Sequence, residues 1–379
     1  MQNGHSVPAV SSWTLVDLGF MRLGETCRVG FQSENVSSLF AGRVVSVQKG
    51  LLRVAVAKSL GQRVQLAWAV LAGRLEHDSG TAPVTGDFVH CEGTLAEESR
   101  LRIVSILPRR TTLVRKAAGE VAEQVIAANV DTVFVVMAVG HDFSVRRLER
   151  YLTAIWAGGA LPVVLLSKID TLNSEQDGQS LLAEIARVAP GVPVHGTSVF
   201  DRSTLDVVRG YFRIGATAAI VGSSGVGKSS LVNALSDASV ALVQDVRGAD
   251  DKGRHTTTSR ELHVLPEGGL IIDTPGMREF MPWDEGTGVS TVFGDLEELA
   301  LRCRFSNCRH EAEPGCALVA ALETGEIDAG RIASWHKLQR EQAWLARRAD
   351  AGAMRAERLK WKKINKEVRQ RPKRGRPGW

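Results

Sequence analysis

The sequence has no long uninterrupted apolar run, and its cysteines are few. The longest apolar stretch, residues 154–166, is interrupted by two glycines and a proline and is shorter than the roughly 20 residues that span a bilayer. No basic segment followed by an apolar core opens the chain, so we expect no signal peptide. Five cysteines in 379 residues do not make a disulfide framework. We therefore expect a cytoplasmic protein without a membrane partner.

A glycine-rich segment at residues 222–229 fits the phosphate-loop pattern G-x-x-x-x-G-K-[ST]. The apolar run before it predicts a buried strand, and the residues after it predict a helix. Backbone N–H groups at such a turn cradle phosphates at the helix N-terminus. Lys228 would reach the β- and γ-phosphates, and the Ser229 hydroxyl would ligate Mg²⁺. The predicted phosphate-binding residues are Gly222, Ser223, Ser224, Gly225, Val226, Gly227, Lys228, Ser229 and Ser230.

A second segment, residues 269–276, reads as a buried strand that ends in D-x-x-G. Asp273, which lies 45 residues after Lys228, would hold Mg²⁺ through a water molecule. The N–H of Gly276 would sense the γ-phosphate. D-x-x-G is a weak signal by itself because Asp and Gly are common turn residues, but its place after a strand supports a nucleotide hydrolase.

The loop between these two motifs, residues 253–258, suits a switch segment. By spacing we predict that Thr257 ligates Mg²⁺ and that His255 positions the attacking water. A solvated loop with an exposed histidine is the alternative. Ras-like GTPases carry Gln after D-x-x-G, whereas this chain has Met277, whose thioether orients water poorly. We therefore predict slow intrinsic turnover that a partner stimulates.

A base-reading motif lies upstream of the phosphate loop. Residues 167–170 read S-K-I-D after an apolar run, which is similar to the guanine motif N-K-x-D. Asp170 can accept from both N1–H and the 2-amino group of guanine, whereas adenine would leave it unpaired. The Lys168 stem can lie over the base, but Ser167 is expected to be too short for the bridging contacts that Asn makes. The predicted base-binding residues are Ser167, Lys168, Ile169, Asp170, Thr197 and Ser198, the last two near guanine O6 through a backbone N–H.

The order of these motifs is unusual, because the base-reading segments precede the phosphate loop. In most GTP-binding domains they follow it. The order indicates a circular permutation, which α/β domains tolerate because their termini usually lie close together. We therefore expect an unchanged sheet and site, with the D-x-x-G switch leading directly into a C-terminal module.

Three cysteines and a histidine cluster near the C-terminus, at Cys303, Cys308, His310 and Cys316. Three thiolates and one imidazole are a tetrahedral ligand set of structural Zn²⁺, with no position left for a catalytic water. Buried free cysteines beside an unrelated histidine are the alternative.

The flanks of the nucleotide domain carry signals for RNA binding. Five short strands are predicted at residues 43–48, 51–57, 64–71, 87–91 and 102–107, which suit a small barrel of the OB type. A barrel without a ligand is the alternative. Residues 354–379 hold eleven Lys or Arg and two Glu, a net +9 against +5 for the whole chain. Such a run seeks polyanions, although a merely solvated tail is also possible.

Together these residues resemble the RsgA (YjeQ) family of circularly permuted GTPases. The permuted order, the G-R-H-T-T-T loop at residues 253–258, D-T-P-G at residues 273–276 and the Cys/His spacing carry the resemblance. It implies an N-terminal OB barrel, a central permuted P-loop GTPase of α/β class and a C-terminal zinc-binding helical domain. The implied boundaries are an extension at 1–38, the barrel at 39–112, the GTPase at 113–287 and the zinc domain with its basic tail at 288–379.

The resemblance also implies a function in late maturation of the small (30S) ribosomal subunit. GTP would be hydrolysed to GDP under stimulation by the subunit and its 16S rRNA, with Mg²⁺ and one structural Zn²⁺ as cofactors. We expect a monomer that does not bind DNA. Two alternatives remain open: a nucleotide-switched rRNA-binding module with incidental hydrolysis, and a P-loop ATPase with relaxed base choice, which Ser167 would permit.

Overall fold

The computed structural model describes residues 13–23, 39–48, 51–76, 82–96, 99–116, 123–140, 143–235, 240–241, 260–265, 268–273 and 287–343. Contacts divide the chain into two compact units. The first comprises residues 1–115 and 124–282, and the second comprises residues 116–123 and 283–379. Within the described ranges, no helix has the length and apolar character needed to cross a membrane.

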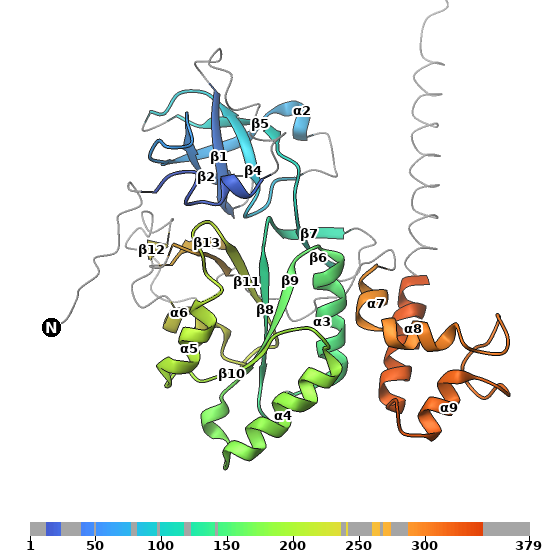
Figure 1. Cartoon of the computed structure of the whole chain (residues 1–379). Helices are drawn as coiled ribbons and strands as arrows, with labels where there is room; N and C mark the ends of the chain where they lie inside the picture. Colours follow the sequence, from blue (N-terminus) through green and yellow to red (C-terminus); the bar gives the residue numbers. More distant parts are fainter. Residues whose placement is uncertain are drawn as a thin grey trace, which may run out of the picture. The chain divides into compact units, whose positions relative to one another are not determined.

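Five strands of the first unit form a closed barrel, in the order β1-β2-β3-β5-β4, with β4 pairing back onto β1 (Figure 1). They are β1 (Leu39–Gln48), β2 (Leu51–Ala57), β3 (Gln65–Leu71), β4 (Phe88–Glu92) and β5 (Leu101–Ile106), with helix α2 (Gly73–Glu76) after β3. β3 and β5 run parallel, and the other neighbours run antiparallel. The predicted barrel is confirmed, and its first strand begins four residues earlier than expected.

Strand β1 closes the barrel because it bends enough to pair along both of its edges. A register shift between Val44 and Ser46 marks a bulge against β2, and bulges increase the local twist. At Gly42 an added Cβ would lie 2.6 Å from the Cγ1 of Val54. The interior is filled by Phe40, Val44, Leu52, Val54, Val56, Ala67, Ala69, Val89, Cys91, Leu101 and Ile103.

The rest of the first unit is built on a mainly parallel sheet with the order β10-β9-β8-β11-β14-β13. Its strands are β8 (Thr132–Ala138), β9 (Leu161–Ser167), β10 (Val194–Thr197), β11 (Thr217–Val221), β13 (Glu261–Val264) and β14 (Leu270–Asp273). Only β13 is antiparallel to its neighbour in this order. A short strand β12 (Val240–Ala241) pairs with β13, and β6 (Thr112–Lys116) pairs separately with β7 (Glu123–Ala128). Because β8 precedes β11 by a long stretch of chain yet lies beside it, the order agrees with a permuted domain.

Helices cover both faces of this sheet, with α3 and α4 on one face and α5 and α6 on the other (Figure 1). They are α3 (Val145–Ala157), α4 (Glu175–Val188), α5 (Arg202–Arg209) and α6 (Lys228–Leu235), with a 3-10 turn η3 (Ile169–Thr171) before α4. α3 buries Leu148, Leu152 and Ile155 at the spacing of an amphipathic helix. At the start of α4 the Ser174 hydroxyl accepts the N–H of Asp177, which is a typical N-cap.

A buried arginine, Arg43 on β1, joins the barrel to the parallel sheet. Its guanidinium donates to three carbonyl oxygens over 2.6 to 3.3 Å, those of Leu18, Gly86 and Asn129. It also lies over the ring of Phe88. Burial lowers the pKa of Arg43 to about 9, so the group remains charged at pH 7.

Backbone contacts reinforce the same junction. β1 pairs with the first residue of β13, and the Thr85 hydroxyl donates to the Arg260 carbonyl over 3.0 Å. Gly86 has a φ of 95°, and an added Cβ there would lie 2.1 Å from the carbonyl oxygen of Ala128. Only glycine permits so close an approach in this conformation. Barrel and sheet therefore meet through contacts that leave little freedom of position.

Residues 13–23 pack against the barrel and include the 3-10 helix η2 (Phe20–Arg22). Thr14 forms a β-bridge with Arg63, and the Phe20 ring meets the Phe88 ring edge-on at 5.5 Å. The buried side chains of this stretch are Trp13, Leu15, Leu18, Phe20 and Leu23. Their spacing fits neither a strand nor a helix, which is why the sequence pattern did not indicate a packed stretch within residues 1–38.

Residues 287–343 of the second unit are mainly helical. They contain α7 (Thr287–Val292), α8 (Gly294–Ala300), α9 (Ala317–Glu323) and a further helix at residues 329–343. Arg331 ties this last helix to α7 and α8, because its guanidinium donates to Asp295 and to the Val292 carbonyl, each at 2.9 Å, and lies over the Phe293 ring. The basic tail at residues 354–379 lies outside the described residues.

Replacing Arg43 by alanine is expected to lower the free energy of unfolding by about 3–5 kcal/mol, because the buried carbonyls of Leu18 and Asn129 lose the guanidinium donor and that of Gly86 keeps only the Asn129 amide. Urea denaturation of the full-length chain measures this. The matched control is Arg102→Ala: Arg102 is 66% exposed and its ion pair with Glu92 spans 3.7 Å, so its loss should cost less than about 1 kcal/mol. Equal destabilisation by the two substitutions would contradict the role of Arg43.

Candidate functional site

The segments predicted to bind a nucleotide follow the carboxyl ends of neighbouring strands. Thr197 at the end of β10 and Ala138 at the end of β8 both pair with Ser167, the last residue of β9. The phosphate loop follows Val221 at the end of β11, and β14 ends at Asp273. Because parallel strands end at one edge of the sheet, the base motif and the phosphate loop converge although the chain visits them in permuted order.

The phosphate loop, residues 222–229, turns from β11 into α6. Three of its glycines have positive φ, and the value at Gly222 is 147°. An added Cβ at Gly222 would lie 2.3 Å from the Val136 carbonyl oxygen of β8, so the loop can rest on the sheet only because this residue is glycine. The turn places the first residue of α6, Lys228, at the position where backbone N–H groups bind phosphate.

The Lys228 ammonium lies against the carbonyls of its own loop. It donates to the Gly222 carbonyl over 2.8 Å and to the Ser223 carbonyl. These contacts keep the ammonium at the loop, within reach of phosphates that the loop binds. Ser229 and Ser230, the next residues of the helix, are exposed.

Ser167 and Lys168 join the base motif to the phosphate loop. The Ser167 hydroxyl donates to the Val226 carbonyl over 2.6 Å, and the Lys168 ammonium donates to the Gly225 carbonyl over 2.8 Å. The expectation that Ser167 is too short to bridge is therefore wrong. Ser167 is buried at the end of β9, directly beside the loop, so even a short side chain reaches it.

The rest of the base motif forms a tight turn. Lys168 has a φ of 62°, and Asp170 lies in the 3-10 turn that follows, with its side chain exposed. Thr197 is buried at the end of β10. The Ser198 N–H, which we expected near guanine O6, donates to the Thr204 hydroxyl over 3.0 Å. The motif does not indicate this partner, because Thr204 belongs to the following helix.

Arg147 is a second contact that the motifs do not indicate. It lies in the first turn of α3, and its Nη1 donates to the Ser223 hydroxyl of the phosphate loop. The fold creates this contact: α3 follows β8, and β8 lies beside the strand that carries the loop. A hydrogen bond from a charged donor contributes about 1.5–3 kcal/mol, so Arg147 fixes the loop more firmly than a neutral contact would.

The predicted switch residues lie outside the described part of the chain. They are His255, Thr257, Gly276 and Met277. Of Asp273 only the backbone is described, at the end of β14 and paired with Glu261 of β13. Their roles stay predictions.

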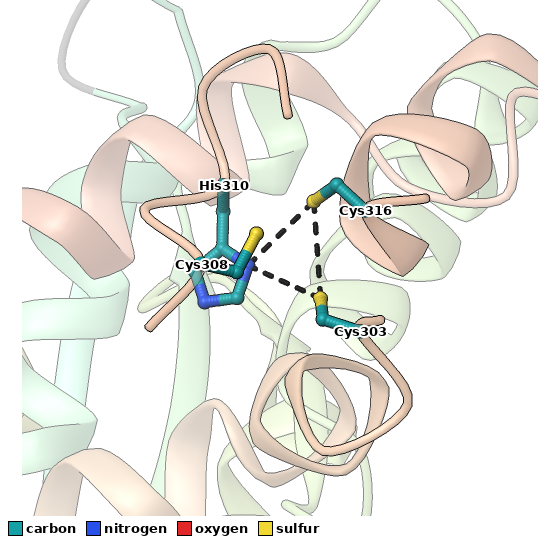
Figure 2. Close-up of side chains that lie close together, drawn as sticks. All are labelled: Cys303, Cys308, His310 and Cys316. Carbon is teal, nitrogen blue, oxygen red and sulfur yellow. Dashed lines mark hydrogen bonds between the residues drawn. The ribbon is translucent and has the colours of Figure 1, made fainter. Parts of the chain in front are cut away.

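The four predicted metal ligands converge in the second unit, and Figure 2 shows their side chains close together. The ligand atoms of Cys303, Cys308, His310 and Cys316 lie within 4.8 Å of one another. The Cys303 Sγ lies 3.9 Å from the Cys316 Sγ and 3.4 Å from the His310 Nδ1. The Cys316 Sγ lies 3.6 Å from that nitrogen. Two thiolates on a tetrahedral zinc, each at about 2.3 Å, stand about 3.8 Å apart, so the donor set fits one such ion.

The loop that carries these ligands is held by a carboxylate. Glu313 accepts the backbone N–H groups of Arg309, Glu311 and Ala312 over 2.8 to 3.2 Å. These bonds, first that from Arg309, lower the pKa of Glu313 to about 2. His310 sits inside this loop with a φ of 62°. Hydrogen bonds from the loop's backbone to the Glu313 carboxylate therefore fix the shape of the loop around the ligand cluster.

Comparison with known proteins finds relatives along most of the chain. A family model described as RsgA GTPase matches residues 106–283. A protein of Methanosarcina acetivorans named small ribosomal subunit biogenesis GTPase RsgA is 41% identical over 325 residues, covering 86% of this chain and 85% of that protein. One of the same name from Streptomyces avermitilis is 40% identical over 359 residues, covering 94% and 93%.

Two solved structures are similar to this fold. YjeQ from Thermotoga maritima aligns with a TM-score of 0.59 at 25% identity, covering 80% of this chain and 99% of that one. YloQ, described as a circularly permuted GTPase, aligns with a TM-score of 0.56 at 25% identity, covering 82% and 98%. The second description agrees with the strand order found here.

Removing the contact between Arg147 and Ser223 should weaken GDP binding by about tenfold, because the loop loses a charge-assisted hydrogen bond. Arg147→Ala, Ser223→Ala and the double variant form a cycle that calorimetry can measure. Arg146→Ala, an exposed neighbour, is the control and should leave the affinity unchanged. Strictly additive losses in the double variant would show that the two side chains act separately.

Proposed function

The chain belongs to the RsgA GTPase family, and from this premise we propose that it hydrolyses GTP during biogenesis of the small (30S) ribosomal subunit. The observation that carries the proposal is the direct joining of a guanine-type motif to a phosphate loop, through the hydrogen bonds of Ser167 to Val226 and of Lys168 to Gly225. The two relatives named above carry that biogenesis function in their names.

Guanine recognition is assigned to the edge formed by the ends of β9 and β10. Asp170 would accept from N1–H and from the 2-amino group, and Lys168 would lie along the base plane. Ile169, Thr197 and Ser198 would line the same side, with Ser167 holding the motif to the loop. The ATPase alternative rests on Ser167 in place of Asn, and a comparison of ATP with GTP tests it, because the bond of Ser167 to Val226 concerns the loop and not the base.

Phosphoryl transfer in such a site is positioning and charge stabilisation. The backbone of Gly222 to Ser230 would hold the β- and γ-phosphates together with the Lys228 ammonium, and Ser229 would take Mg²⁺, which neutralises charge that develops on the phosphate oxygens. From sequence spacing we assign the second Mg²⁺ ligand to Thr257 and the water-mediated contact to Asp273. We assign the contact with the γ-phosphate to the Gly276 N–H and the positioning of the attacking water to His255.

A partner completes the site in this proposal. Met277 occupies the place where Ras-like proteins carry the water-orienting Gln, so the free protein should turn over slowly. We propose that the small subunit and its 16S rRNA cause the attacking water to be oriented, which Met277 cannot do. A nucleotide-switched RNA-binding module with incidental hydrolysis is the second candidate, favoured by the same Met277.

RNA attachment is assigned to the barrel and to the basic tail. On neighbouring strands β2 and β3 the Arg53 guanidinium lies over the half-buried Trp68 ring at 4.9 Å. Cations interleaved with aromatic rings suit RNA bases and phosphates. We further propose a cytoplasmic monomer that does not bind DNA, organised as an extension (1–38), barrel (39–112), GTPase (113–287) and metal domain (288–379).

The metal of the second unit is proposed to be one structural Zn²⁺. Three thiolates and an imidazole at tetrahedral separations suit zinc, and they leave no ligand position for a reacting water. Bound zinc would hold the loop of Glu313 to the start of α9, and so fix the fold of this small unit.

Purified small subunits should raise the rate of phosphate release from GTP by about tenfold or more, because they order the catalytic water. Phosphate release from the full-length chain with and without subunits measures this. Lys228→Ala should abolish the stimulated rate, and ATP in place of GTP should not support it. A rate that the subunits leave unchanged would favour the binding module over the enzyme.

Zinc should be present at one ion per chain and should be lost from the Cys308→Ser/Cys316→Ser variant, because two of its four ligands are removed. Elemental analysis of the purified protein measures the zinc. Cys91→Ser is the control, since Cys91 lies in the barrel core and its replacement should leave the zinc in place. Stoichiometric zinc in the double variant would refute the ligand assignment.

A further inference from the structure

A cavity of about 650 Å³ opens at the amino-terminal edge of the parallel sheet. The first residues of β8 and β9, Thr132 and Leu161, line it, as does Gly210 at the end of α5. The phosphate loop and the base motif follow the carboxyl ends of the same strands. The cavity is therefore separated from the nucleotide site by the length of the sheet.

Three arginines and a single acid, Asp131, line this cavity. Asp131 is fully engaged: one carboxylate oxygen accepts from Arg22 at 3.2 Å and from Arg110 at 2.6 Å, and the other accepts the Thr217 N–H at 2.8 Å. Arg213 is exposed, and its guanidinium has no hydrogen-bond or ion-pair partner among the described residues. The arginines thus exceed the acid by two charges.

Helix dipoles reduce this excess without cancelling it. α3 and α5 both end at the cavity, beside Gly159 and Gly210. Each helix C-terminus carries roughly half a negative charge, so about one unit of positive charge stays uncompensated. Arg213 carries it, in a position open to solvent and to a ligand. A bound anion would compensate the charge of Arg213.

The walls of the cavity suit a base next to that anion. Leu161 is 59% exposed and Val207 is 46% exposed, although both are aliphatic. The Tyr211 ring is fixed in place, because its hydroxyl pairs with the His195 Nε2 at 2.7 Å and its edge packs on Phe134. A bare inorganic anion would leave these apolar walls unused, whereas a nucleoside phosphate would cover them.

We propose that this cavity binds a nucleoside phosphate, with Arg213 and Arg110 holding the phosphate and Leu161, Val207 and Tyr211 contacting the base. Guanidinium groups bind phosphate oxygens in a fork geometry, and unstacked bases lie on aromatic or aliphatic surfaces. A volume of this size suits one nucleotide. The ligand is either an unpaired nucleotide of single-stranded RNA or a free nucleotide. The site lies outside the GTP-hydrolysing machinery and does not depend on it.

The test is protection of Arg213 from phenylglyoxal, followed by peptide mass spectrometry on the full-length chain. One equivalent of GDP with Mg²⁺ first occupies the phosphate-loop site. Cytidine 3′,5′-bisphosphate, a ten-nucleotide unstructured RNA and inorganic phosphate are then compared at equal ionic strength. Arg187 is the internal reference, because it is exposed on α4 and does not line the cavity.

We expect the bisphosphate and the RNA to slow modification of Arg213 while Arg187 reacts at an unchanged rate. Protection at a lower concentration of the RNA assigns the ligand to RNA, and the reverse order assigns it to a free nucleotide. Calorimetry should show that Arg213→Glu weakens bisphosphate binding by about tenfold and that Arg187→Glu does not, since only the first removes a phosphate contact.

Two results would overturn the proposal: equal protection by inorganic phosphate, or an affinity for the bisphosphate that Arg213→Glu leaves unchanged. Either outcome leaves GTP hydrolysis untouched, because the cavity lies at the edge of the sheet opposite the phosphate loop and the base motif. Phosphate release by Arg213→Glu without subunits should equal that of the wild type, which also shows that the variant folds.

Discussion

Parallel pairing of β8 with β11 is the contact on which the nucleotide site depends. β8 lies in the part of the chain that carries the base motif, and β11 carries the phosphate loop, so this strand pair joins the two permuted halves within the sheet. The loop rests on this strand pair through Gly222 and the Val136 carbonyl. A slip of one residue would turn every side chain of β11 to the opposite face and would remove the loop from that support. The geometry of this site therefore depends on which strands lie side by side, and less on the order in which they occur along the chain.

The barrel strands, the phosphate loop and the metal ligands could be predicted from the sequence, because each depends on a local pattern. Alternating apolar residues with turn signals locate strands, and a glycine-rich turn or a Cys/His spacing is read within a few residues. The contacts of Ser167, Thr204 and Arg147 could not be predicted, because packing decides them. Residues 13–23 were missed for a related reason: their apolar side chains fit gaps between elements and follow no period.

Two arginine clusters of the first unit, one buried around Arg43 and one around Asp131 at the cavity, have different roles. The Arg43 guanidinium donates to three carbonyl oxygens and lies over the Phe88 ring, so several neutral groups together stabilise its charge. A group with such partners holds the junction of barrel and sheet in one geometry. Arg22, Arg110 and Arg213 lie nearby in the same unit but face a cavity, and Asp131 satisfies only two of them. The first cluster is closed and structural, and the second is open on one side.

The pairing of β1 with β13 affects how this protein can be divided. The segment that matches the family model begins at residue 106, the last residue of the barrel strand β5, so the model by itself would define a fragment without the barrel. Cutting there would uncover the start of β13, the Arg260 carbonyl and the apolar surface around Ala128. Uncovered strand edges recruit other chains, so a fragment cut at the bounds of the family model would be prone to aggregation. In this protein the unit of folding is larger than the segment that matches the family model.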